Sequence, residues 1–439
     1  MVNQGKSVLG IISWIAWFGV LWFVAMPRTD DYLSRWNEHL KKVTVAIVLL
    51  LAVAGVGIAG AYIGLKANLI KPDSFNEPLK SALAYFITQP RYSDGAALTQ
   101  QATVNFIAGK NPYASSNIIS AMETYDHQAS DANGPFVNLT PIQAGQFTDV
   151  FPYPSQEALT SLWDQSRSDP GSVPVEFESR LTYPAGSFLL SVPFVSAGMN
   201  NMQTVVGIFL VLAIAFGLWR VPRESRLIFA IAAAVSLELW ITGLIGLEKR
   251  LVIFPLMIAG WLLIPKHPKV ALVLLGVGAA TYQPVWFLLP FAALYVYHLW
   301  GLKRAAIGVG LAIATFLAFN LPFIIDDPSL WFTSVMAPMI DPLYPLGVGL
   351  VSLTETGIIN IQSSTVFTAL ELTALLIGLW WYYKNGLRYP ATGLLLAILP
   401  VFFAWRSLGS YFFYFDIILL ATVLIEYRAR APAPIKCAV

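Results

Sequence analysis

The hydrophobic residues of this chain are gathered into long runs, and polar stretches separate the runs. Several runs approach or exceed the ~20 apolar residues that a helix needs to cross a bilayer. The sequence predicts membrane-spanning helices over these segments: Ser7–Ala25, Val43–Leu65, Gln203–Trp219, Leu227–Gly246, Leu251–Ile264, Val270–Thr281, Val285–Trp300, Ala305–Ile325, Thr365–Tyr383, Ala391–Trp405 and Tyr411–Tyr427. Leu251–Ile264 and Val270–Thr281 are short for a full crossing. We expect them to be broken helices or to lie where the bilayer is thin.

Two long polar intervals divide this pattern into domains. We predict two N-terminal spans with a cytoplasmic connector over 1–65, an extracytoplasmic loop domain over 66–201, a transmembrane bundle over 202–427 and a cytoplasmic tail over 428–439. The second polar interval, 326–364, forms another outer loop within the bundle. The first interval is too long for a simple connector and is expected to fold on the membrane surface. Its last part, 183–195, is apolar but too short to span, and we interpret it as a helix dipping into the interface.

Charge predicts the orientation of the spans. Lys and Arg gather in one alternate set of connectors, which the positive-inside rule places in the cytoplasm. This set comprises Arg28, Arg35, Lys41, Lys42, Arg220, Arg223, Arg226, Lys266, Lys269, Lys303, Arg304, Lys384, Arg388, Arg428, Arg430 and Lys436. The alternation places both polar intervals and the N-terminus outside and the C-terminus inside. Alternatively, the first apolar run lies along the membrane surface.

The composition agrees with a multi-pass protein of the cell membrane. Of the 439 residues, 56% are hydrophobic and 12% are charged, about half the charged share of a soluble domain. The net charge of +2 gives no indication of nucleic-acid binding. The single cysteine, Cys437, excludes an intramolecular disulfide and a cysteine-based metal cluster. The four histidines lack metal-ligand spacing, so we predict no metal and no cofactor.

The most informative polar stretch runs from Arg91 to Tyr113. Asp94 precedes a predicted helix from about Gly95 to Ile107, and its carboxylate can accept the free amide hydrogens of the first turn. Gly109 is expected to end this helix, and Asn111-Pro112-Tyr113 to form an ordered turn. An acid at a helix start beside a membrane is also well placed to act as a general base. The local sequence favours the capping role and leaves the catalytic role open.

A second group of candidates is cationic and lies on the predicted outer side, where Lys and Arg are rare. Lys249 and Arg250 precede one span, and Arg406 lies between two others. Because a guanidinium can hold a phosphate through two parallel hydrogen bonds, these residues are candidate ligands of a lipid phosphate. The alternative is that they extend to the interface or pair with acids. Gln283 lies in a Tyr-Gln-Pro turn. This turn is either a simple proline break or an outer turn that faces an active-site cavity.

The order of these features is similar to that in one superfamily of membrane enzymes. An acid follows an early span at Asp94, and Asn111-Pro112-Tyr113 follows one helix later. Tyr183-Pro184-Ala-Gly-Ser187 closes the loop. Asn320-Leu-Pro-Phe323 then leads to Asp327-Pro-Ser-Leu-Trp331 before the second outer loop. In this order and topology the chain resembles, from about Leu65 to Tyr427, the GT-C superfamily of polyprenyl-phosphate-sugar-dependent glycosyltransferases. It looks most similar to glycosyltransferase family 87, whose members are mannosyltransferase-like, and more remotely similar to the protein O-mannosyltransferases.

The resemblance implies an all-α, GT-C-like bundle of about eleven transmembrane helices with an extracytoplasmic cavity. A polyprenyl-phosphate hexose, with mannose expected, would enter this cavity from the bilayer. Asp94 would act as general base on the acceptor hydroxyl of a glycan, glycolipid or protein, and the anomeric centre would invert. The donor phosphate would be held by Arg406, Arg250 and Lys249. The residues that would shape the cavity are Asn111, Tyr113, Tyr183, Gln283 and Asp327.

The chain also departs from the superfamily pattern. Gly95 follows Asp94 where the protein O-mannosyltransferases have a second acid, and Ala185 stands where related sequences often have a second proline. About thirty residues separate the second span from Asp94, where many relatives have only a few. A non-catalytic membrane subunit on the same scaffold is therefore an alternative. A transporter of lipid-linked sugars is a further alternative, although the internal repeat typical of transporters is not evident.

Overall fold

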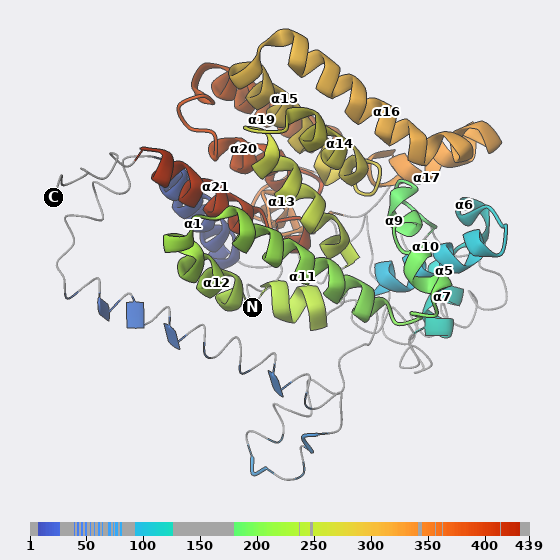
Figure 1. The fold of residues 1–439 in the computed structure, drawn as a ribbon. Coiled ribbons are helices and arrows are strands. Elements are labelled where there is room, and N and C mark those ends of the chain that lie inside the picture. The colour runs from blue at the N-terminus through green and yellow to red at the C-terminus, as the bar shows by residue number, and fades with distance from the viewer. Residues whose placement is uncertain are drawn as a thin grey trace.

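The computed structural model describes residues 8–26, 93–125, 180–236, 238–245, 249–340, 345–355, 357–361, 363–412 and 414–430, with short pieces and single positions between 39 and 80. Over these residues the protein is mostly helical, and its longer helices pack into a bundle (Figure 1). The predicted span Val43–Leu65 and most of the predicted loop domain fall largely outside the described residues.

The bundle helices follow the predicted apolar runs. They are α1 (Val8–Ala25), α11 (Met202–Arg220), α12 (Arg226–Val235), α13 (Phe254–Leu263), α14 (Pro268–Ala279), α15 (Pro284–Trp300), α16 (Leu302–Asp326), α19 (Ser364–Asn385), α20 (Thr392–Phe402) and α21 (Phe415–Arg430). Within the described part, four segments are long and apolar enough to cross a membrane: Met202–Arg220, Leu302–Asp326, Ser364–Asn385 and Gly409–Glu426. Several long apolar helices together are typical of a multi-pass membrane protein.

Shorter elements surround the bundle. They are α5 (Asp94–Ile107), α6 (Pro112–Ser115), α7 (Ile118–Tyr125), α9 (Gly186–Leu189), α10 (Val192–Ser196), α17 (Pro328–Ile340), α18 (Val351–Glu355), the 3₁₀-helices η5 (Arg223–Ser225), η7 (Lys249–Ile253) and η8 (Gly409–Tyr411), the π-helix η6 (Glu238–Ile245), and the paired parallel strands β1 (Leu346–Gly347) and β2 (Arg406–Ser407). Helices α5, α6, α7, α9, α10 and α17 gather at one end of the bundle (Figure 1).

One predicted span is broken. The apolar run Leu227–Gly246 was expected to form one continuous helix, but α12 ends at Val235 and a separate π-helix begins at Glu238. The indole N–H of Trp240 donates to the carbonyl of Ala233 at 2.9 Å. This carbonyl lies in the last turn of α12, where a helix end leaves carbonyls without an intrahelical partner. The expectation of a continuous helix was therefore wrong.

The two short apolar runs form a helical hairpin. Helices α13 and α14 have 10 and 12 residues, and α14 packs between α13 and α16. Glycines allow the close approach. A Cβ atom on Gly260 would lie 2.6 Å from Leu275 Cγ, and one on Gly276 would lie 2.7 Å from the carbonyl oxygen of Ala312. Small residues at such crossings are typical of helix packing in membranes.

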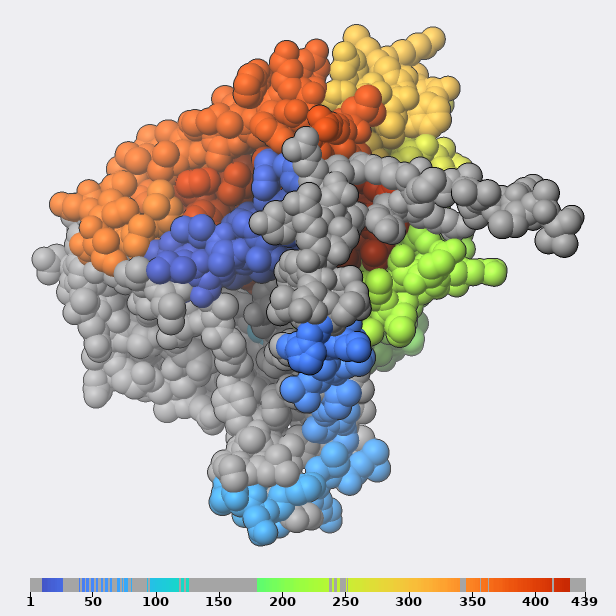
Figure 2. Space-filling view, turned by 90° about the vertical axis from the view of Figure 1, so that its left-hand side faces the viewer, coloured from blue at the N-terminus to red at the C-terminus, as the bar shows by residue number. Residues whose placement is uncertain are grey.

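The first helix is part of the same bundle. Three of its aromatic residues contact the C-terminal helices: Trp14 lies 4.9 Å from Phe412, Phe18 lies 5.4 Å from Phe402, and Trp22 lies 4.9 Å from Trp381, measured between ring centroids. Figure 2 shows α1, in dark blue, lying against the orange surface of later segments. Aromatic pairs of this kind stabilise packing by about 0.5–1.5 kcal/mol each beyond area burial.

Candidate functional site

Helix α5 begins and ends in two well-defined caps. The N-cap is Ser93, whose hydroxyl accepts the amide hydrogen of Ala96 at 3.2 Å. The prediction that Asp94 caps this helix was therefore wrong: Asp94 is the first helical residue, because the adjacent serine is an equally favoured cap. The side chain of Asp94 lies outside the described part of the structure. Gly109 ends the helix with a φ of 73°, as predicted.

The N-terminal half of α5 is buried against neighbouring elements. Ala96 and Ala97 are fully buried, and the helix packs against α9, α10 and η7. The side-chain amide of Gln100 donates to the carbonyl of Asn200 at 2.5 Å. The segment that carries Asp94 therefore contacts the segment that carries Lys249 and Arg250. The side chain of Lys249 lies outside the described part.

A hydrogen bond joins the first long polar interval to the second. Asn111 begins α6, where its side-chain oxygen accepts the amide hydrogen of Tyr113 at 2.9 Å. Its side-chain N–H donates to a carboxylate oxygen of Asp326 at 2.7 Å. The predicted turn at Asn111 is thus the start of a short helix. Asp327 serves at the start of α17, where its carboxylate accepts the amide hydrogen of Leu330 at 2.9 Å.

Tyr113 is a buried anchor between these segments. Its side chain is 3% exposed, and its ring lies 6.1 Å from Phe188 and 5.6 Å from Phe323. Its hydroxyl donates to the carbonyl of Tyr183 at 3.0 Å. Burial raises the pKa of the Tyr113 phenol far above its ordinary value, and a hydrogen bond with Trp331 lowers that pKa to a smaller extent. The phenol is therefore a fixed donor that holds Tyr183 in place.

Asn320 fixes the same segment from the bundle side. This fully buried residue of α16 accepts the amide hydrogen of Ala185 at 2.9 Å and the indole N–H of Trp331 at 3.2 Å. It also donates to the carbonyl of Phe316 at 3.0 Å. One side chain therefore ties α16, α17 and the 183–186 segment together.

An aromatic and cationic cluster continues from Tyr183 into the bundle. The ring of Tyr183 stacks on Tyr282, with centroids 5.1 Å apart and 19° between the planes. The hydroxyl of Tyr282 accepts a hydrogen bond from Arg250 Nε at 2.8 Å. The guanidinium of Arg250 lies 5.1 Å from the ring centre of Tyr282 and 4.3 Å from that of Tyr411, and it also donates to Ser410 Oγ. We call Tyr183, Tyr282, Arg250, Ser410 and Tyr411 the arginine cluster.

The position of Arg250 is chemically unusual. Its side chain is only 6% exposed, although a buried guanidinium needs hydrogen bonds and countercharge to offset lost hydration. The two rings supply a cation–π surface, and two hydroxyl groups supply hydrogen bonds. A guanidinium can also bind a carboxylate or a phosphate through two parallel hydrogen bonds.

Gln283 positions the turn that carries Tyr282. Its side-chain N–H₂ donates to the carbonyl of Thr182 at 2.6 Å and to that of Val335 at 3.0 Å. This amide therefore connects the start of α15 to the loop before α9 and to α17.

The second polar interval, 326–364, pairs through β1 with the strand that carries Arg406. This residue lies in β2 opposite Leu346 of β1, four positions before Ser410 of the arginine cluster. Sequence reasoning missed Glu355, which is 8% exposed and accepts the amide hydrogen of Gly347 at 2.8 Å. Its only sequence signal was an acid in an interval without lysine or arginine.

Most of the described candidates therefore meet at one end of the bundle. Tyr113 bonds to Tyr183, and Tyr183 is connected to Arg250 through Tyr282. Asn111 and Gln283 fix the surrounding segments. Within the described residues, no group of three His, Cys, Asp or Glu side chains could hold a metal ion. Comparison of the chain with protein families, curated proteins and solved structures gives no match.

Proposed function

We propose that this protein is an inverting glycosyltransferase that moves a hexose, with mannose expected, from a polyprenyl-phosphate donor to an acceptor hydroxyl. In this proposal the chain is a GT-C-like bundle of about eleven spans in the cell membrane. Its active site would face the extracytoplasmic side. The acceptor is a glycan, a glycolipid or a protein.

One observation carries the proposal: α5, which bears Asp94, packs against η7, whose Arg250 is buried between two tyrosine rings. Glycosyl transfer from a lipid phosphate needs a base for the acceptor hydroxyl and a cation for the leaving phosphate. The two groups have to lie near each other, on either side of the reacting carbon. Contact between their segments supports this arrangement.

The reaction balances with these residues. The carboxylate of Asp94 takes the proton of the acceptor hydroxyl while the hydroxyl oxygen attacks the anomeric carbon. The bond between that carbon and the phosphate oxygen breaks, and polyprenyl phosphate leaves with the electron pair. Arg250, together with Arg406 and Lys249, would stabilise the negative charge that grows on the phosphate.

The test is sugar transfer in membranes that contain wild type, Asp94→Asn or Arg250→Gln, with labelled polyprenyl-phosphate mannose as donor. Asparagine keeps the shape of Asp94 but cannot take a proton, so we expect transfer to fall about 10²-fold or more. Loss of Arg250 removes a cation at the leaving group and is expected to cost about 10²–10³-fold. Asp73→Asn is the matched control, because Asp73 is an exposed acid of the same predicted domain that pairs with Lys80 at 2.8 Å.

The outcomes separate the alternatives. Transfer that is lost in Asp94→Asn and kept in Asp73→Asn, with equal amounts of protein, supports the base assignment. Equal transfer by the wild type and Asp94→Asn would remove Asp94 from the mechanism. The search for a base would then turn to Asp326, Asp327 and Glu355. No transfer by the folded wild type with any polyprenyl-phosphate hexose would overturn the enzyme proposal in favour of a non-catalytic subunit.

A further inference from the structure

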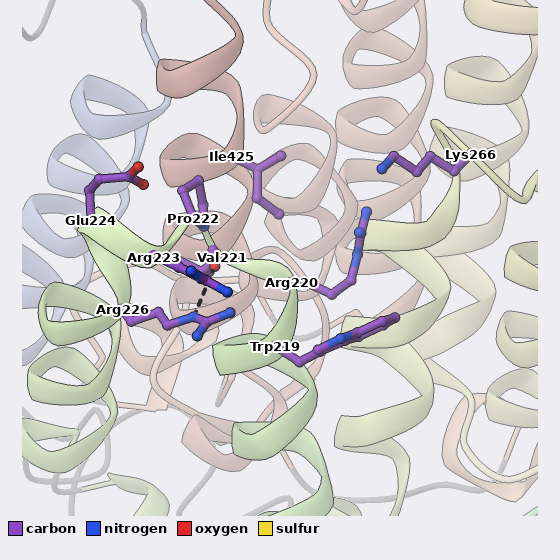
Figure 3. Close-up of a pocket in the computed structure, with 9 residues that line it drawn as sticks. All are labelled: Trp219, Arg220, Val221, Pro222, Arg223, Glu224, Arg226, Lys266 and Ile425. Atoms are coloured by element: carbon purple, nitrogen blue, oxygen red, sulfur yellow. Dashed lines mark hydrogen bonds between the residues drawn. The ribbon is translucent and has the colours of Figure 1, made fainter.

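A basic pocket lies at the end of the bundle opposite the arginine cluster. It has a volume of about 720 Å³, and its lining comes from the end of α11, from η5 and the start of α12, from the turn after α13, and from α21 (Figure 3). The residues that line it are Trp219, Arg220, Val221, Pro222, Arg223, Glu224, Arg226, Lys266 and Ile425. We call this the basic pocket.

The lining of the basic pocket favours an anion. Its ionisable groups are four cations and one acid, so the cations repel one another more than the acid can offset. Figure 3 shows Lys266 extending toward the side of the pocket where Arg220 lies. One N–H of Arg220 donates to the carbonyl of Leu262 at 3.2 Å. Its Nε is buried and has no hydrogen-bond partner among the described residues.

The depth of the pocket matches that of lipid phosphates. Arg220 is the last residue of α11, and Ile425 lies near the end of the Gly409–Glu426 segment, and both segments are long and apolar enough to cross a membrane. The ends of such helices lie at the level of the headgroups, about 15 Å from the bilayer centre. By the distribution of Lys and Arg, this end is the cytoplasmic one.

The surface beside the pocket is apolar and exposed. Trp219 is 66% exposed, and Leu227 and Ile228 on α12 are 70% and 54% exposed. A soluble phosphate would make no use of this surface, whereas the acyl chains of a phospholipid would cover it. A tryptophan at this level is also typical of the membrane interface.

We propose that the basic pocket binds the phosphate headgroup of an anionic phospholipid of the cytoplasmic leaflet, with the acyl chains lying along α11 and α12. Arg220 and Lys266 contact the phosphate from one side, and Arg223 and Arg226 from the other. The site is independent of the proposed glycosyl transfer, since it lies at the other end of the bundle.

The test is native mass spectrometry of the full-length protein in detergent with phosphatidylglycerol or phosphatidylcholine. We expect the wild type to retain phosphatidylglycerol more strongly than phosphatidylcholine. Each cation near a headgroup contributes about fivefold in affinity, so Arg223→Gln and Lys266→Gln should each weaken retention by about that factor. Both residues are exposed, so neither change is expected to impair folding.

The matched control is Arg304→Gln. Arg304 lies at the same end of the bundle, on α16, and stacks on Trp300 at 4.4 Å, but it does not line the pocket. Its loss should leave retention of phosphatidylglycerol unchanged. Equal retention by wild type and the two pocket variants, or an equal loss in Arg304→Gln, would overturn the proposal. Full displacement of the lipid by glycerol phosphate would show that the pocket binds a free phosphate and would overturn the lipid assignment.

Discussion

Asn320→Leu tests how the candidate site is held together. Leucine is close to asparagine in size, so it fills the same buried space without an oxygen or an N–H₂ group. The amide of Ala185 and the indole of Trp331 then lose their acceptor, and the carbonyl of Phe316 loses a donor. Because the site is fully buried, water does not replace these partners.

The expected magnitude follows from the groups left without partners. A buried donor without an acceptor costs about 1–3 kcal/mol. For the Ala185 amide we take about 2 kcal/mol, which corresponds to a factor of about thirty in the equilibrium between open and closed states. The 183–186 segment should therefore open about thirty times more often in the variant. The stacking of Tyr183 on Tyr282 would be disturbed with it.

The assay is amide hydrogen–deuterium exchange followed by mass spectrometry on peptides covering residues 181–190. These amides include Ala185 and also Gly186, which donates to the carbonyl of Ala280 at 2.8 Å. We expect faster exchange in this peptide in Asn320→Leu, while peptides from α11 and α19 keep the wild-type rate. Local exchange is the right measure because the change should release one segment and leave the bundle folded.

The matched control is Asn385→Leu on α19. Asn385 donates to the carbonyl of Trp381 at 3.0 Å, one turn earlier in its own helix, as Asn320 does to Phe316. The control therefore loses the same intrahelical bond without releasing any other element, and exchange in residues 181–190 should not change. Wild-type exchange of that peptide in folded Asn320→Leu would refute the reasoning, because Asn320 would not be what holds the segment.

Two further predictions concern the outer segments. Gly347→Ala should lower the free energy of unfolding by about 2 kcal/mol, because Gly347 has a φ of 154° and an added Cβ would clash with the carbonyl oxygen of Ser407. Thermal unfolding measures this loss. Gly310→Ala is the control, because an added Cβ at Gly310 meets no atom within 4 Å. Tyr113→Phe removes the bond to Tyr183 and should cost about 1 kcal/mol at neutral pH. Because the pKa of Tyr113 is raised in the folded state, its contribution is full below the ordinary tyrosine pKa and is lost as pH rises above about 10. Unfolding at alkaline pH should therefore be steeper with pH in the wild type than in Tyr113→Phe.

Hydropathy predicted the long bundle helices of the described residues but missed a break within one apolar run. The apolar runs predicted α11, α16 and α19 to within a few residues, since a helix in a bilayer has to satisfy its own backbone. The run from Leu227 to Gly246 contains Ser236 and Glu238, and the break between α12 and the π-helix falls at these residues. Glu238 is the first residue of the π-helix, and the indole N–H of Trp240 donates across the break to the carbonyl of Ala233.

The sequence identified individual candidate residues of the site but not the residues that surround them. Charge rarity on the outer side pointed to Arg250, and the turn before Pro284 pointed to Gln283. The two tyrosines around Arg250 lie 32 and 161 positions away in sequence, so their contact with it depends on how the helices pack. The N-cap of α5 was misassigned by one residue because Ser93 and Asp94 are both favoured caps.

The length of α13 limits how far Arg250 can lie from Lys266. From Arg250 to the end of α13 the chain has four residues of 3₁₀-helix and ten of α-helix, which span about 25 Å or less. The hydrocarbon core of a bilayer is about 30 Å thick. If Lys266 lies at the cytoplasmic headgroups, as the proposed lipid site requires, Arg250 would lie below the headgroups of the other leaflet. A cation at that depth would need partners that offset its lost hydration, and the rings of Tyr282 and Tyr411 contact the guanidinium. The same depth would favour the proposed lipid-linked donor, because a soluble donor would have to leave water to reach Arg250.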